Sequence, residues 1–147
     1  MKLLDKLISE IEQRNNKPFL KAAMGVCALT ASADGVVSLE ERYRIDAVLE
    51  RVKELRIYDP HKAIAQLNLF LDGLKHDPEE TKRVLTTKIA RYRDDYKSAR
   101  TLLRIAYLVM SVDEEITETE RAAFDEICVA LAVDPSEVFD KMAAETR

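Results

Sequence analysis

Residues 32–42 read SADGVVSLEER, and residues 111–121 read SVDEEITETER. A constant offset of 79 residues relates the two stretches, so an aspartate and a glutamate recur at matching positions. Each copy follows an apolar run and precedes an amphipathic pattern, which predicts a repeated unit of helix, acidic turn and helix. The matching acids are Asp34 and Glu41 in the first copy and Asp113 and Glu120 in the second.

The pattern outside the two copies is helical as well. Apolar residues recur at intervals of three and four, and only 3 Gly and 4 Pro interrupt 147 residues. We therefore predict an all-α protein, a single domain over residues 1–147 folded as a compact bundle of seven or eight helices. The repeat units cover about residues 18–57 and 98–132, and we expect a pseudo-twofold axis between them. Helices are expected to open near residues 3, 18, 38, 60, 78, 98, 117 and 135.

Local signals mark several of these helix starts. Asp59-Pro60 and Asp77-Pro78 each place a capping side chain before a proline at the first helical position. Glu80 stands where it would complete a capping box with Asp77. The helix that begins at residue 78 is expected to bend or break near Asp94-Asp95. The nearly all-apolar helices at about 18–32 and 98–111 are expected to pack together at the centre.

Charge is unevenly distributed along the chain. The net charge of −4 disfavours a dedicated nucleic-acid binder, but the stretch 82–104 carries a net charge of +6. On a single helix, four of its cations would form one basic face suited to an anionic membrane surface or an acidic partner. The alternative is a solvated face paired with Asp94 and Asp95. The four cations are Arg93, Lys97, Arg100 and Arg104.

Two cysteines, Cys27 and Cys128, lie in apolar helical runs. They are too few for a disulfide scaffold, which indicates a reducing compartment and favours core thiols over reactive ones. No run of 18 apolar residues predicts a membrane span, and the charged N-terminus does not read as a signal peptide. We therefore expect a cytoplasmic protein.

The repeated acids suit a divalent metal ion. Carboxylate oxygens are ligands for Ca²⁺, Mg²⁺ or Mn²⁺, and a pseudo-twofold axis would let both copies converge on one site. Four carboxylates brought together would repel one another without a cation between them. An ordinary EF-hand does not fit, because the first ligand positions of such a loop are not acidic in either copy. The predicted metal ligands are Asp34, Glu41, Asp113 and Glu120.

Helix capping is the structural alternative for two of these acids. Glu41 follows Ser38 by three residues, and Glu120 follows Thr117 by three, which is the spacing of a capping box. A capping box needs no aspartate in the preceding turn. The repeated aspartates are therefore the stronger indication of a metal site.

The chain also resembles a known family. The helix that ends in SADGVVSLEE, its second copy SVDEEITETE and the basic section between them are similar to the TerB family of tellurite-resistance proteins, from about Leu3 to Met142. The resemblance implies an all-helical, pseudosymmetric fold in a cytoplasmic bacterial protein. It implies metal chelation by the acidic residues of both copies. Its implied partners are other products of the tellurite-resistance operon, including an integral membrane protein of the TerC type and Ca²⁺-binding TerD-type proteins.

Three functions are compatible with these observations. The first is a non-enzymatic, cation-binding scaffold in tellurite resistance and chemical stress, brought to the membrane by its partners. The second is a metal-independent structural adaptor in which every acid serves as a cap. The third, a metal-dependent hydrolase, is less favoured, because His61 and His76 stand alone and no nucleophile or base accompanies the carboxylates.

Overall fold

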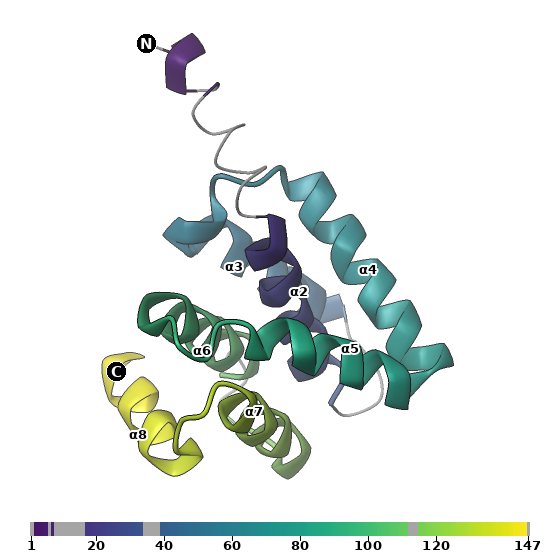
Figure 1. The fold of residues 1–147 in the computed structure, drawn as a ribbon, viewed down its shortest axis with the longest axis vertical. Helices are drawn as coiled ribbons and strands as arrows, with labels where there is room; N and C mark the ends of the chain where they lie inside the picture. Colours follow the sequence, from purple (N-terminus) through teal and green to yellow (C-terminus); the bar gives the residue numbers. More distant parts are fainter. Residues whose placement is uncertain (1, 6, 8–16, 34–38, 112–114, 147) are drawn as a thin grey trace.

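The computed structural model describes residues 2–5, 7, 17–33, 39–111 and 115–146. All regular secondary structure in these ranges is helical, which confirms the all-α class. Residues 2–5 and 7 are helical, and the rest of the first expected helix lies outside the described residues. The other elements are α2 (Lys17–Ala31), α3 (Leu39–Arg51), the 3₁₀ helix η1 (Lys53–Leu55), α4 (Pro60–His76), α5 (Pro78–Ala90), α6 (Tyr96–Met110), α7 (Glu118–Ala130) and α8 (Pro135–Thr146), as Figure 1 shows.

Helix bounds follow the sequence repeat residue for residue. The bounds of α2 and α3, moved by 79 positions, are the bounds of α6 and α7. The repeat in sequence is therefore also a repeat in the bounds of the helices. The pseudo-twofold axis between the two units stays a prediction.

Helix α2 lies at the centre of the bundle. Every residue from Ala22 to Ala31 is buried, because a helix that is apolar on all sides needs neighbours on all sides. Its neighbours include α4, α5, α6 and α7 (Figure 1). The expected packing of the two apolar helices is confirmed, since α2 lies against α6. Fully buried side chains of the core include Met24, Ile45, Leu85, Leu102, Ile105, Met110 and Phe124.

The second helix of each unit packs on the apolar helix of the other unit. Helix α3 lies against α6, and α7 lies against α2. This crosswise arrangement means that neither apolar helix is covered by its own partner alone. The two units consequently share one layer of buried side chains.

Several start signals act as expected. The Asp59 carboxylate accepts the backbone N–H of His61 at 2.9 Å and caps α4. The expected break after α5 is confirmed, because Asp95 caps the new helix α6 by accepting from the backbone N–H of Ser98 at 3.2 Å. The corresponding cap of α3, Ser38, lies outside the described residues.

The predicted cap of α5 is wrong. Asp77 stands at the N-cap position with φ −145° and ψ 74°, and its side chain makes no capping hydrogen bond. Glu80 does not complete a capping box either, because its carboxylate accepts from the Arg83 guanidinium at 2.9 Å (Nε to Oε2). The ion pair with Arg83, one turn farther along the helix, replaces the capping hydrogen bond that the Glu80 carboxylate would otherwise accept.

Candidate functional site

The four predicted metal ligands are only partly described. Asp34 and Asp113 lie outside the described residues, and of Glu41 only the helical backbone, in the first turn of α3, is described. Glu120 lies in the first turn of α7. Among the described residues, no three His, Cys, Asp or Glu side chains are grouped so that they could hold a metal ion. The metal site formed by these four acids therefore stays a prediction.

Glu120 takes part in the capping box that its spacing predicts. The Thr117 hydroxyl accepts the backbone N–H of Glu120 at 3.1 Å, and Oε1 of Glu120 accepts the backbone N–H of Thr117 at 3.2 Å. The capping role of this glutamate is confirmed. The capping bond engages one of the two carboxylate oxygens, and a carboxylate can accept at both.

An arginine that the sequence reading missed joins the two repeat units. Arg44 of α3 is 6% exposed, and its Nη1 donates to the carbonyl oxygen of Val109, near the end of α6, at 3.2 Å. A guanidinium at a helix C-terminus satisfies a terminal carbonyl and lies at the negative end of the helix dipole. The sequence contains one signal for this contact: Arg44 lies next to Ile45 and four residues before Val48, and is thus a single cation on the apolar face of its helix.

This hydrogen bond fixes which ends of the helices meet. It joins the second turn of α3 to the last turn of α6. One acidic stretch of the sequence leads into α3, and the other leaves α6. The described ends that flank the two acidic stretches therefore lie on the same side of the bundle.

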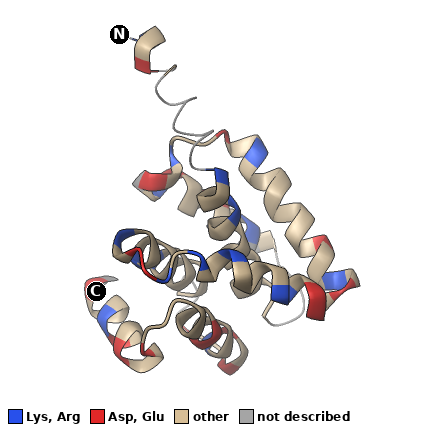
Figure 2. Cartoon of the chain, viewed as in Figure 1, with Lys and Arg blue, Asp and Glu red and all other residues tan. Residues whose placement is uncertain are grey.

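The basic stretch does not form a single-helix face. Arg93 precedes α6, so the four cations are not carried by one helix. Two of the cations pair with distant acids: Arg100 pairs with Glu145 of α8 at 2.9 Å, and Arg104 pairs with Glu54 of η1 at 3.2 Å. Of the expected local acids, Asp95 has its pKa lowered by hydrogen bonds from Ser98 and, to a smaller extent, by its interaction with Lys97. Figure 2 shows basic residues along α5 and at the start of α6, and acidic residues on α7 and α8. The positive charge of the stretch 82–104 is thus partly neutralised by acidic residues that are distant in the sequence.

Both cysteines belong to the core. Cys27 and Cys128 are fully buried, and burial raises the pKa of each thiol to about 12. A thiol with such a pKa holds almost no thiolate at neutral pH, and the thiolate is the reactive form. The interpretation of both residues as core thiols is confirmed.

No helix among the described residues is long and apolar enough to cross a membrane. This agrees with the sequence, which contains no apolar run of that length.

Comparison with known proteins assigns the chain to one family. The family described as "Tellurite resistance protein TerB" matches residues 20–143. A protein of Alcaligenes sp named "Tellurium resistance protein TerB" is 27% identical over 101 residues, which cover 69% of this chain and 83% of that protein. No solved structure matches the chain. The matched range contains both acidic stretches and runs from the fourth residue of α2 into α8.

Proposed function

Because the chain belongs to the TerB family of tellurite resistance proteins, we propose that it is a non-enzymatic scaffold whose two acidic turns bind one divalent cation. The ligands are Asp34, Glu41, Asp113 and Glu120, and the ion is Ca²⁺, Mg²⁺ or Mn²⁺. Binding fixes the two helix–turn–helix units relative to each other. The scaffold acts in tellurite resistance and chemical stress.

The single observation that carries the proposal is the hydrogen bond from Arg44 to Val109. Glu41 precedes Arg44 by three residues, and Asp113 follows Val109 by four. Four residues of chain extend at most about 14 Å, and this short reach supports the proposal that carboxylates from both units serve one ion. The crosswise packing of α3 on α6 and of α7 on α2 supports the same arrangement.

A cation at this place would act on the packing between the units. The Arg44 guanidinium already places one positive charge beside the end of α6. The carboxylates of both units would together carry more negative charge than the Arg44 guanidinium can balance. A divalent ion would neutralise the remaining negative charge. The ion would thereby stabilise the contact between α3 and α6 without adding any apolar area.

The structural adaptor is the second candidate, and one observation favours it. Glu120 caps α7 together with Thr117, so this acid has a role that requires no metal. If every acid served in this way, adding metal or chelator would leave the melting temperature unchanged. A bound ion would raise the melting temperature, because it binds the folded state alone.

Calorimetric titration with Ca²⁺, Mg²⁺ and Mn²⁺ tests the proposal. The wild type is compared with Asp34→Asn/Asp113→Asn, which removes the two acids that capping does not explain. We expect binding heat in the wild type and its loss in the variant. Equal weak heats in both proteins would contradict a shared metal site.

A pair of substitutions in α7 separates capping from metal binding. Glu120→Gln keeps a side chain that can complete the capping box but lowers its charge, so affinity for the ion falls while stability without metal changes little. Thr117→Ala removes the cap and keeps all four carboxylates, so stability falls while metal affinity is retained. The adaptor function predicts that neither variant alters any response to metal.

The partners proposed for the scaffold are other tellurite-resistance proteins, including a TerC-type membrane protein and TerD-type proteins. An anionic membrane surface or an acidic partner at the stretch 82–104 belongs to the same proposal. Three cations of that stretch, Lys82, Lys97 and Arg93, are exposed. We expect the partners to co-purify with the wild type and to be lost when these three residues are replaced by Gln. Unchanged co-purification would contradict the use of this surface.

A further inference from the structure

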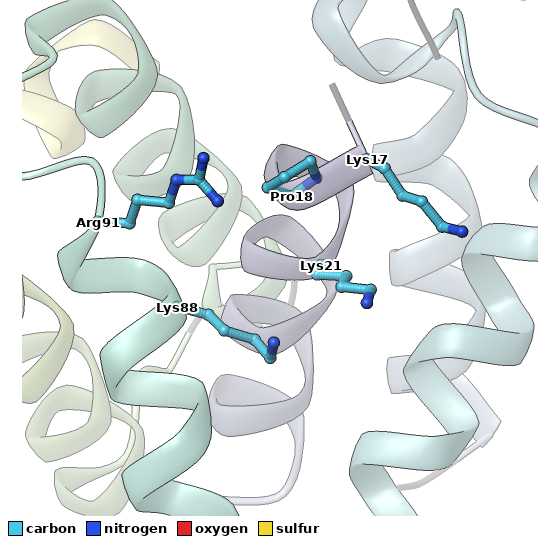
Figure 3. A pocket seen from close by; sticks show the side chains of 5 residues that line it. All are labelled: Lys17, Pro18, Lys21, Lys88 and Arg91. Atoms are coloured by element: carbon cyan, nitrogen blue, oxygen red, sulfur yellow. The ribbon is translucent and has the colours of Figure 1, made fainter. Parts of the chain in front are cut away.

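A basic pocket lies between the start of α2 and the end of α5. It has a volume of about 270 Å³ and is lined by Lys17, Pro18, Lys21, Lys88 and Arg91. Figure 3 shows Lys88 and Arg91 extending from α5 toward α2, whereas Lys21 and Lys17 extend from α2 on the side away from α5. Four of the five lining residues are cationic and none is acidic.

Packing holds the two walls of the pocket in place. Phe19 and Tyr92 meet edge to face with ring centroids 5.5 Å apart, just beyond the lysines and the arginine. Farther along α2, Gly25 allows a close approach, since a Cβ there would lie 3.2 Å from Cδ2 of Leu85. These two contacts show that α2 and α5 run antiparallel beside the pocket.

The charges of the pocket are not balanced within the described part of the chain. None of its four cations forms an ion pair with a described carboxylate. The first turn of α2 contains no acid, so two lysines lie at the positive end of its helix dipole. Lys88 and Arg91 lie at the C-terminal end of α5, where the helix dipole favours cations. Their charges nevertheless add to the positive electrostatic potential of the pocket. Such crowding of like charges destabilises the fold unless an anion offsets it.

We infer that this pocket binds a multiply charged oxyanion, the phosphate group of a small molecule or of a lipid headgroup. Lysine supplies point charges for phosphate oxygens, and the planar Arg91 can donate two parallel hydrogen bonds to them. The volume is slightly below the range of about 300–1,000 Å³ usual for drug-sized ligands, which suits a compact charged group.

The oxyanion pocket is separate from the proposed cation site. Lys17 opens α2, whereas the first acidic stretch follows its last residue, Ala31. Fifteen helical residues place the two ends about 22 Å apart. One central helix would thus have an anion at one end and a cation at the other, and each can be tested without the other.

Titration with sodium pyrophosphate and inorganic phosphate, at constant ionic strength, tests the pocket. Lys21→Gln/Lys88→Gln removes one cation from each wall. Lys62→Gln/Lys141→Gln is the matched control, because it makes the same change in net charge at two exposed lysines outside both the pocket and the stretch 82–104. We expect the pocket variant to bind pyrophosphate at least about tenfold more weakly, and the control less than about twofold more weakly.

The melting temperature without ligand gives an independent readout. Because the four cations repel one another, the pocket variant should melt no lower than the wild type without ligand. Phosphate should raise the melting temperature of the wild type and of the control variant but not of the pocket variant. Equal effects of phosphate on both double variants and the wild type would overturn the inference. Arg91→Gln at an exposed position repeats the test should the double variant fail to fold.

Vesicles distinguish the two sources of phosphate. Sedimentation with phosphatidylcholine vesicles, with and without phosphatidic acid, is measured both in the absence and in the presence of pyrophosphate. Binding to the phosphatidic acid vesicles that pyrophosphate displaces and the pocket variant loses identifies a headgroup site. Binding of pyrophosphate without vesicle binding identifies a soluble phosphate compound. Failure of the wild type to bind either would overturn the inference.

Discussion

The two helix–turn–helix units share their helix bounds but not their surroundings. Helix α2 is buried from Ala22 to Ala31, whereas α6 keeps a charged side that reaches out to other elements. The offset of 79 pairs Gly25 with Arg104: one lies against Leu85, and the other forms an ion pair with Glu54. The local sequence thus sets where the helices begin and end, and the neighbouring helices decide which faces are apolar.

The second helices of the two units differ in the same way. Arg44 of α3 donates to α6, but its counterpart in α7 is Ala123, so the link is made in one direction only. Helix α3 leads into the 3₁₀ helix η1, whereas α7 ends at Ala130 and is followed by Ala132 at φ 58°. Two backbone hydrogen bonds, from Ala132 to Val129 and from Val133 to Cys128, complete a Schellman motif there.

The largest effect is expected where the units differ most. Gly25→Arg places the residue of α6 at the matching position of α2, beside Leu85 and without a carboxylate partner. The buried charge alone should lower the free energy of unfolding by about 3–5 kcal/mol. Urea unfolding followed by circular dichroism measures it. Arg104→Ala, at the exposed counterpart, should cost less than about 1 kcal/mol; similar losses in both variants would mean that the two positions are equivalent.

The one-way link between the units comes next. Arg44→Ala leaves the carbonyl oxygen of Val109 without this donor and should lower the free energy of unfolding by about 1–3 kcal/mol. Arg42→Ala, at an exposed position of the same helix, should change it by less than about 0.5 kcal/mol. A similar small change in both variants would show that the hydrogen bond does not join the units.

The cap of α7 has a smaller expected effect. Thr117→Ala removes the hydroxyl that accepts the backbone N–H of Glu120 and should cost about 0.5–2 kcal/mol. Thr117→Ser keeps an equivalent hydroxyl and should restore most of the stability. Thermal unfolding of the three proteins under metal-free conditions provides the comparison, and a serine variant as unstable as the alanine variant would argue against capping.

The smallest effect is a gain. Ala132 has a positive φ, which costs a residue with a Cβ about 1 kcal/mol relative to glycine. Ala132→Gly should therefore raise the free energy of unfolding by up to about 1 kcal/mol, less any loss from greater freedom of the unfolded chain. Ala123→Gly, inside α7, should lower it by a similar amount. A loss at both positions would contradict the left-handed conformation of Ala132.

Sequence signals predicted most of the fold because they act over one or two turns. Proline at the first helical position located α4, α5 and α8, and the apolar pattern identified α2 as the central helix. The capping box at Asp77 failed for equally local reasons: the backbone N–H of Asp77 donates to the Gly73 carbonyl oxygen at the end of α4, and Arg83 pairs with Glu80. The missed contacts are long-range. Arg100 and Arg104 pair with acids 45 and 50 residues away, which no spacing rule contains.

Much less of the candidate sites was visible in the sequence. The capping box of Glu120 follows from its distance to Thr117, but the oxyanion pocket requires two antiparallel helices from separate parts of the chain. Its lysines and arginine appear in the sequence as ordinary surface charges. Arg44 was missed as well, although a lone cation on an apolar face is a signal that could have indicated a buried partner.

The crosswise packing of α3 on α6 and of α7 on α2 has a consequence for biosynthesis. On the ribosome, the first unit emerges well before the second, with the apolar surface of α2 still uncovered. Until the second unit has been synthesised, chaperones can bind the exposed apolar surface of the first unit. Two fragments cut between α4 and α5 should likewise remain largely unstructured apart and regain helicity together, as complementing halves of one core.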